Sequence, residues 1–201
     1  MKSRNLFIVL MSLAILSPCF PQENSPQEAA QDEMAAQMEM FEKLSRPGEF
    51  HKILEDFVGT WNSTVKMWMD PSAPPTVSKG TATNKLIFDG RFLYGEYLGE
   101  FMGSPFKGIN IMGYDNAKKE FFSIWIDNTT TGLLSSTGSY DPQEKKFYFE
   151  AVAFDPISGQ TLEMREESYF ASKDEYISIT YTKSKEGQEF KNMEIRYTRI
   201  K

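Results

Sequence analysis

The sequence of 201 residues has one cysteine, one histidine and, after its first twenty residues, no apolar run long enough to cross a membrane. With Cys19 alone, an intramolecular disulfide and a site of several thiolates are both excluded. With His51 alone, a Ser-His-Asp triad or a two-histidine metal site has one imidazole to use, and the charged residues around it indicate that this imidazole lies on the surface of a short helix. Haem is not expected either, because no expected strand carries a histidine. We therefore expect no catalytic set, no metal and no cofactor.

An excess of basic residues is also lacking. The formal net charge is −6, with 22 Lys and Arg against 28 Asp and Glu. The basic residues are scattered among acids, as in Lys118-Lys119-Glu120, which is typical of a solvated surface. A nucleic-acid surface needs clustered Lys and Arg to meet phosphates, so nucleic acid is not an expected partner.

Residues 1–20 have the pattern of an export signal. Lys2 and Arg4 precede a short apolar run, which predicts a periplasmic, secreted or lipid-anchored protein of the cell envelope. The segment Leu16-Ser17-Pro18-Cys19 resembles a bacterial lipoprotein cleavage box, in which Cys19 would be acylated. Pro18 departs from the small residue usual there, and an ordinary cleaved signal is the alternative. A lipid anchor on Cys19 is the only membrane contact that we expect.

Residues 21–48 are predicted to be a tether followed by a helix. The segment 27–44 is rich in Ala, Glu, Gln and Met and contains no Gly or Pro. Met34, Met38 and Phe41 lie on one stripe of this helix. The stripe either packs on its own domain or offers a surface to a partner.

Residues 49–201 are predicted to fold as a β domain. From Gly108 to Asp141 the chain has three runs rich in β-branched and aromatic residues, each closed by a turn such as Asp115-Asn116. Asp89-Gly90 is a strong hairpin signal. In the first strand Trp61, Ser63, Val65 and Met67 alternate with polar residues. About ten such strands in up-and-down order would leave two exposed edges unless the sheet closed on itself. The expected fold is therefore mainly β: a closed antiparallel barrel with a short N-terminal helical segment.

Gly59-Thr60-Trp61 after a short helix resembles the entry to lipocalin-type and fatty-acid-binding-type barrels. A longer resemblance covers residues 45–201. The segments HKILEDFVGTW, VKMWMDPSAPPTVSKGTA, GRFLYGEYLGEFMGSPFKGINIMGYDNAKKEFFSIWIDNTTTG and MEIRYTRIK are similar to an exported bacterial family known as domain of unknown function 1579. This resemblance implies a lipocalin-like, calycin-type barrel and little about chemistry. In such barrels a basic side chain of the last strand covers the Trp, which here implies a contact between Arg199 and Trp61.

A barrel of this size is either filled by side chains or holds one small ligand. Residues of aromatic or polar character at mid-strand are candidates for the cavity wall: Tyr97, Asn110, Met112, Trp125, Arg165 and Tyr181. Two inward-facing acidic residues of the strands could also act as acid and base. The acidic residues on expected strands are Glu96, Glu100, Asp127, Glu163, Glu166 and Glu167. Sequence spacing alone does not show whether two strands bring such carboxylates together.

Three functions stay open at this point. The first is an exported, non-catalytic barrel that binds a small, partly apolar ligand. The second is an envelope interaction module with a filled barrel. There the Met-rich helix and the strand 120–127, which is apolar on both faces, form an interface, for example with a second copy of the chain in a homodimer. The third is a hydrolase or isomerase that uses inward carboxylates.

Overall fold

The computed structural model describes residues 25–155, 159–184 and 187–201, without the side chain of Asp155. Cys19 and the expected export signal lie outside these described residues. Among the helices that are described, none combines the length and the apolar character that a membrane crossing requires.

The first element is the helix α1, Pro26–Ser45. It begins at Ser25, where a reciprocal pair of hydrogen bonds forms a capping box. The Ser25 amide donates to Glu28 Oε2 at 2.8 Å, and the Glu28 amide donates to Ser25 Oγ at 3.3 Å. None of the residues of α1 is buried, and the Met34, Met38 and Phe41 side chains are all exposed.

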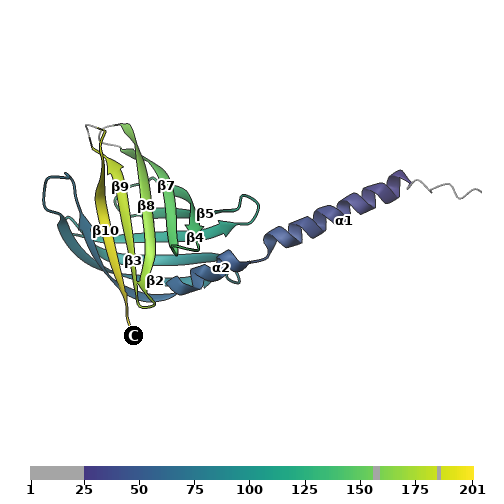
Figure 1. The fold of residues 1–201 in the computed structure, drawn as a ribbon, viewed down its shortest axis with the longest axis horizontal. Helices are drawn as coiled ribbons and strands as arrows, with labels where there is room; N and C mark the ends of the chain where they lie inside the picture. Colours follow the sequence, from purple (N-terminus) through teal and green to yellow (C-terminus); the bar gives the residue numbers. More distant parts are fainter. Residues whose placement is uncertain (1–24, 156–158, 185–186) are drawn as a thin grey trace, which may run out of the picture. The chain divides into compact units, whose positions relative to one another are not determined.

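The rest of the chain forms a closed barrel of ten antiparallel strands in sequence order, as predicted (Figure 1). Each strand pairs with its neighbours in the chain, and β1 pairs with β10 to close the sheet. The strands are β1 Gly59–Met67, β2 Thr76–Ile87, β3 Phe92–Phe101, β4 Ser104–Asp115, β5 Glu120–Asp127, β6 Leu134–Asp141, β7 Lys146–Asp155, β8 Gln160–Ser172, β9 Glu175–Lys183 and β10 Glu189–Arg199.

Alternation decides which side chains point into the barrel. In β1 Trp61, Ser63 and Val65 are buried, whereas Asn62 and Lys66 between and beyond them are exposed. Tight turns join the strands: Asp89 and Gly90 both have positive φ, as expected for an Asp-Gly hairpin. A second such turn is less obvious in the sequence.

That second turn is Met102-Gly103, with φ of 51° and 78°. It starts β4 at Ser104, so that Pro105 pairs with Glu100 and Ser104 with Phe101. The sequence predicts this strand only from Ile109, because Pro and Gly in 104–108 lower its β-propensity. The structure therefore lengthens this hairpin toward its turn.

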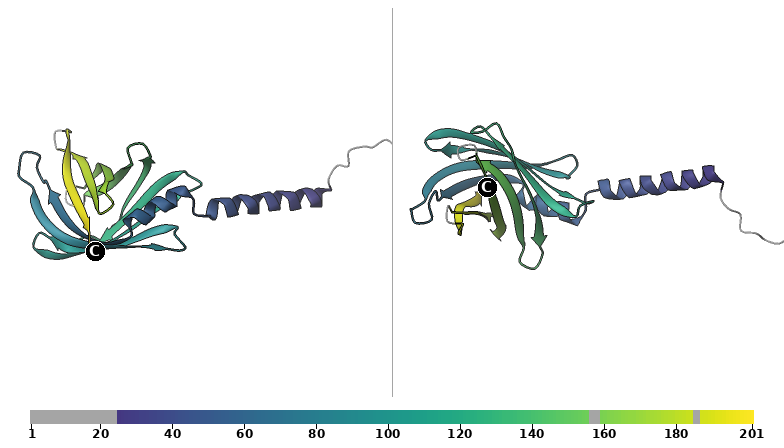
Figure 2. Two further views of the ribbon diagram at one scale, coloured as in Figure 1. Left: turned by 60° about the horizontal axis from the view of Figure 1, so that its bottom comes forward. Right: turned by 90° about the horizontal axis from the view of Figure 1, so that it is seen from above.

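Two short helical turns close one end of the barrel, which we call the base (Figure 2). They are α2, Glu49–Ile53, and the 3₁₀ turn η1, Leu54–Phe57. Leu54 and Phe57 join the main hydrophobic core, together with Trp61 at the start of β1, Phe121 at the start of β5 and Phe147 at the start of β7. The core is thus concentrated at the base. The opposite end of the barrel, which we call the mouth, contributes less to it.

The outer face of β5 is partly covered by other aromatic rings of the barrel. Phe122 points outward and lies 6.1 Å, between ring centroids, from Phe92, which lies 6.1 Å from Phe88. Aromatic pairs at this separation attract one another. Ile126, further along the same face, is exposed. The barrel therefore shields the base end of this apolar face with its own residues.

Candidate functional site: a cavity inside the barrel

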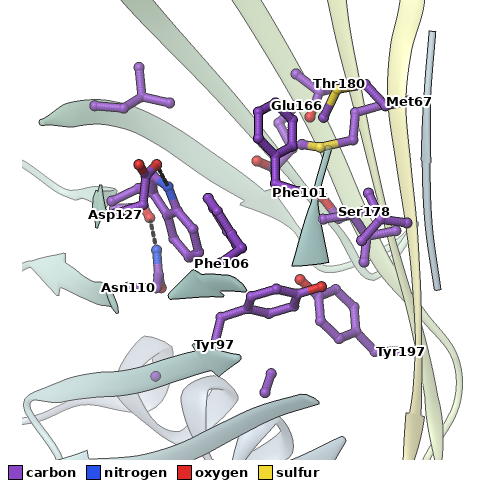
Figure 3. Close-up of a pocket in the computed structure, with 18 of the residues that line it drawn as sticks. Met67, Tyr97, Phe101, Phe106, Asn110, Asp127, Glu166, Ser178, Thr180 and Tyr197 are labelled. Carbon is purple, nitrogen blue, oxygen red and sulfur yellow. Dashed lines mark hydrogen bonds between the residues drawn. The ribbon is translucent and has the colours of Figure 1, made fainter. Parts of the chain in front are cut away.

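A cavity of about 600 Å³ lies between the core at the base and the mouth (Figure 3). All ten strands contribute to its wall, because alternate residues of every strand point inward. Apolar side chains dominate the wall, and a few polar groups interrupt it. The residues most relevant to chemistry are Tyr97, Phe101, Phe106, Asn110, Met112, Ser123, Trp125, Asp127, Glu166, Ser178, Thr180 and Tyr197.

Four of the six wall residues predicted from the sequence line this cavity. Tyr97, Asn110, Met112 and Trp125 belong to β3, β4 and β5, and all four face inward. Tyr97 OH lies 2.9 Å from Ser63 Oγ, so that the tyrosine is held against β1. Neighbouring strands therefore bring these four residues to one part of the wall.

Arg165 and Tyr181 are the exception, and their assignment to the wall is corrected. They are paired residues of β8 and β9 on the outer face, with the guanidinium carbon of Arg165 4.1 Å from the Tyr181 ring centroid. Arg165 also forms ion pairs with Glu167 and Glu189. The reason is parity: Glu166 faces the cavity, so the residues on either side of it in the strand must face outward.

An aromatic wall occupies the β3–β5 side of the cavity. The rings of Phe106 and Trp125 stack with centroids 6.1 Å apart, and Tyr97 contacts both at 5.8 and 6.3 Å. Phe101 extends the cluster to the mouth, 6.0 Å from Phe106. Gly108 is required beneath it, because a Cβ there would lie 2.3 Å from the Trp125 ring. Such a surface suits a flat or apolar ligand.

Asp127 stands at the mouth end of this wall and is held in its ionised form. Trp125 Nε1 donates to Oδ2 at 2.8 Å, and the Thr129 amide and hydroxyl donate to Oδ1 at 2.8 and 2.5 Å. Burial alone would raise the pKa of the carboxyl, but these donors outweigh burial, and the pKa lies below its usual range. Beside it, Asn110 Nδ2 donates to Ser123 Oγ at 2.7 Å.

Glu166 lies on the opposite side of the cavity, with Ser178 and Thr180 (Figure 3). Protein encloses its carboxyl group, and the surface that stays accessible faces the cavity. Burial raises its pKa above the usual value, against one stabilising hydrogen bond from Ser178 Oγ at 2.9 Å. Burial also raises the pKa of Tyr176 and of Tyr197, whose rings stack 4.1 Å apart.

Glu166 lines the cavity, although the sequence interpretation names it only as one of six acidic residues on strands and not as a wall residue. Its neighbours Glu163 and Glu167 are also acidic, and Glu163 is exposed and paired with Lys183 on the outer face. The only signal that separates the three is alternation with Met164 and Ser168, both of which face the cavity. The carboxylate pair of Glu96 and Asp127 is not formed, because the Glu96 side chain is exposed and accepts a hydrogen bond from Tyr94.

His51 is buried in the base, not on a helix surface as the sequence suggested. Its Nδ1 accepts a hydrogen bond from the Gly48 amide at 3.0 Å, and its ring meets Tyr114 edge-on. Desolvation lowers its pKa, which favours the neutral imidazole. Its role is to cap α2. Over the residues that the structure describes, no cluster of three or more His, Cys, Asp or Glu is arranged to hold a metal ion.

Trp61 and Arg199 lie at the base, outside the cavity. Trp61 is fully buried and donates from Nε1 to the Phe57 carbonyl at 2.9 Å. Arg199 occupies the paired position on β10, and its guanidinium carbon lies 3.9 Å from the Trp61 ring centroid. The structure therefore brings these two residues together where the barrel closes.

Comparison with known proteins gives a family and a fold. The model of a family described as "Protein of unknown function (DUF1579)" matches residues 46–199. A comparison with curated protein sequences gives no match. Among solved structures, the S-type phycobiliprotein lyase CPES of Guillardia theta is similar with a TM-score of 0.52 and 11% identity, over 76% of this chain and 93% of the lyase. A DUF3598 protein of unknown function from Nostoc punctiforme matches with a TM-score of 0.23 and 5% identity, over 77% of this chain and all of that one.

Proposed function

The chain belongs to the family of proteins of unknown function DUF1579, and we propose that it is an exported, non-catalytic β-barrel protein that binds a small, partly apolar molecule. The observation that carries this proposal is the cavity of about 600 Å³, which falls within the range of small-molecule sites, roughly 300–1,000 Å³. A barrel that served only as a scaffold would be expected to fill this space with side chains.

The composition of the wall supports the same proposal. Ligand sites combine apolar and aromatic surface with a few placed polar groups, and here the aromatic wall around Trp125 has Asn110 and Asp127 beside it and Glu166 opposite. The similarity in fold to a phycobiliprotein lyase supports a barrel that receives a ligand. At 11% identity, this similarity does not indicate a particular substrate for this chain.

The test is to fill the cavity and measure binding. Ala151 of β7 faces the cavity, whereas its neighbour Val152 is exposed on the outer face. We expect wild-type protein to bind the neutral fluorophore N-phenyl-1-naphthylamine with quenching of Trp125 emission. Ala151→Phe should weaken this binding at least about tenfold, and Val152→Phe should leave it unchanged.

Native mass spectrometry of protein purified from its own host provides the second measurement. A bound molecule that is released on denaturation, and that is lost in Ala151→Phe, supports the proposal. Protein that is always empty, and that binds the fluorophore equally well in both variants, contradicts it.

A second candidate function is a carboxylate-dependent hydrolase or isomerase. One observation favours it: the pKa of Glu166 is raised while that of Asp127 is lowered, which is how an acid and a base are often distinguished. A broad substrate screen addresses it. Turnover that disappears in both Glu166→Gln and Asp127→Asn would establish an enzyme, whereas the binding function predicts no turnover.

A third candidate is an envelope interaction module, favoured by the exposed stripe of Met34, Met38 and Phe41 on α1. Deletion of residues 21–45 separates it from ligand binding. A fall in oligomeric mass would support an interface, and an unchanged monomer that still binds ligand would argue against one.

A further inference from the structure

The charge of the cavity wall narrows the class of ligand. Resting on the proposed binding function, we propose that the ligand is a small organic amine that carries a positive charge on a partly apolar body, and that Glu166 receives its ammonium group. The proposal excludes fatty acids and other carboxylates as the preferred ligands.

The ionisable side chains that point into the cavity are acidic and not basic. Four acidic residues lie along the cavity, but Glu96 and Glu100 are exposed and alternate on β3 with inward residues, so the carboxyl groups that point inward are those of Asp127 and Glu166. No Lys, Arg or His among the described residues lines the cavity. An anionic ligand would lose its hydration there and find no partner of opposite charge, which is costly because buried charges need such partners. A cation entering the same space would meet partners of the opposite sign on both sides.

Glu166 is placed so that its carboxyl group can accept a hydrogen bond from a ligand. Ser178 donates to one oxygen of the carboxyl group, and the described residues provide no further hydrogen bond to it. The group faces the cavity between Phe149, its paired neighbour on β7, and Thr180, its paired neighbour on β9. An ammonium group can donate to this carboxyl, and a charge-assisted hydrogen bond of this kind is about twice as strong as a neutral one.

Aromatic rings lie near both of these acids. Tyr176 and Tyr197 lie on the Glu166 side, and the Trp125 wall lies on the Asp127 side. Ring faces attract ammonium groups, and they also accept the apolar body of a ligand. A carboxylate together with aromatic rings is an environment that favours an organic cation over a metal ion, which would require more oxygen ligands.

Ligand binding should also release protons. In the empty cavity burial raises the pKa of Glu166, and the other titratable groups that face it are Tyr176 of β9 and Tyr197 of β10. Neither tyrosine supplies a positive charge. An ammonium group would stabilise the carboxylate and draw its pKa down, so that affinity for the amine rises with pH until Glu166 is ionised in the free protein as well.

The experiment uses three dansyl probes that share one fluorophore and differ in charge: dansylcadaverine, which is cationic, dansyl-6-aminohexanoic acid, which is anionic, and neutral dansyl-hexylamide. We expect the cationic probe to bind wild-type protein at least about tenfold more tightly than the anionic one at pH 7 and low salt. In Glu166→Gln this preference should fall about tenfold. Glu163→Gln, which makes the same charge change on the outer face of β8, should retain it.

The possible outcomes distinguish a failure of the amine proposal from a failure of the proposed binding function. If no probe binds and the protein is always empty, the proposed binding function fails. If the probes bind but the anionic probe has the same affinity as the cationic one, the binding function is supported and the amine proposal is overturned. This comparison uses wild-type protein alone and so does not depend on whether a variant folds. If the cationic preference is equal in Glu166→Gln and Glu163→Gln, Glu166 is not the receiving group.

Discussion

The guanidinium group of Arg199 lies on the indole of Trp61, with its central carbon 3.9 Å from the ring centroid, where the last strand meets the first. The same group donates to the carbonyls of Asp56, Val58 and Lys173. One side chain therefore joins β10 to the end of η1, to the start of β1 and to the turn between β8 and β9. It stabilises both the closure of the barrel and the base on which the cavity rests.

Arg199→Ala should lower the free energy of unfolding by about 3 kcal/mol, from lost charge-assisted hydrogen bonds and the lost contact with the ring. For a domain of this size the melting temperature should fall by about 10 °C. Thermal unfolding followed by circular dichroism measures the change.

Arg196, on the outer face of the same strand, is the control for this prediction. Its single ion pair with Glu175 is half exposed, and Arg196→Ala should cost at most about 1 kcal/mol. Equal melting temperatures for the two variants would show that Arg199 does not hold the closure.

Gly59→Ala should destabilise the barrel by about 3 kcal/mol for two reasons. Gly59 has φ of +123°, which residues with a Cβ rarely adopt, and a Cβ there would lie 2.8 Å from Arg199 Nη1. Gly90→Ala is the matched control, since φ is +84° and no atom lies within 4 Å of the added Cβ. It should cost about 1 kcal/mol. If urea unfolding gives the same loss for both, the contact with Arg199 is not what requires glycine.

Glu166→Gln should make the protein more stable at pH 7–8 and leave its stability unchanged near pH 4. The pKa of Glu166 is raised in the folded state, so the folded state binds more protons than the unfolded state once the pH exceeds the unfolded-state value. The stability that Glu166 contributes is then lost as the pH rises through its folded-state pKa, and Gln removes this loss.

The measurement for Glu166 is the difference in unfolding free energy between wild type and variant across pH 4–8. The difference cancels the opposite contribution of Asp127, whose pKa is lowered. A variant that is less stable than wild type at high pH would mean that Glu166 is ionised and satisfied in the empty cavity.

Cys19→Ser should move the protein from the membrane fraction to the soluble fraction, if acylation of Cys19 anchors the exported protein. An acylated cysteine supplies the anchor through its buried acyl chains, at about 0.8 kcal/mol per CH₂. Fractionation of cells that express each form, with a mass measurement of the mature N-terminus, tests this. Equal distribution of the two forms would rule out the anchor and leave an ordinary cleaved signal.

The family resemblance, the closed barrel and the number of strands could be predicted from the sequence, and the structure and the family match confirm them. Alternation within each strand was the decisive signal, because burial of Trp61, Ser63 and Val65 follows directly from it. The early start of β4 was missed because the turn at Met102-Gly103 comes before a Pro and a Gly. Pairing with β3, not local propensity, extends that strand.

The site was less predictable, for reasons that lie beyond any single strand. Arg165 and Tyr181 have the character of wall residues but the wrong parity, and only the register with neighbouring strands shows it. His51 looks like a surface residue among Glu49, Lys52 and Glu55, yet the closing of the base buries it. Alternation along β8 separates Glu166 from the neighbouring acids, but which set of residues faces the cavity is seen only when β8, β9 and β10 are placed together around it.

The concentration of the core at the base has a consequence for the motions of the barrel. Every strand runs from a base packed with aromatic rings to a mouth that surrounds open space, so each backbone should pass from slow to fast amide hydrogen exchange along its own length. A ligand that fills the space would supply the missing contacts at the mouth alone. Slower exchange on binding should therefore be confined to the mouth halves of the strands, while the base stays as it was.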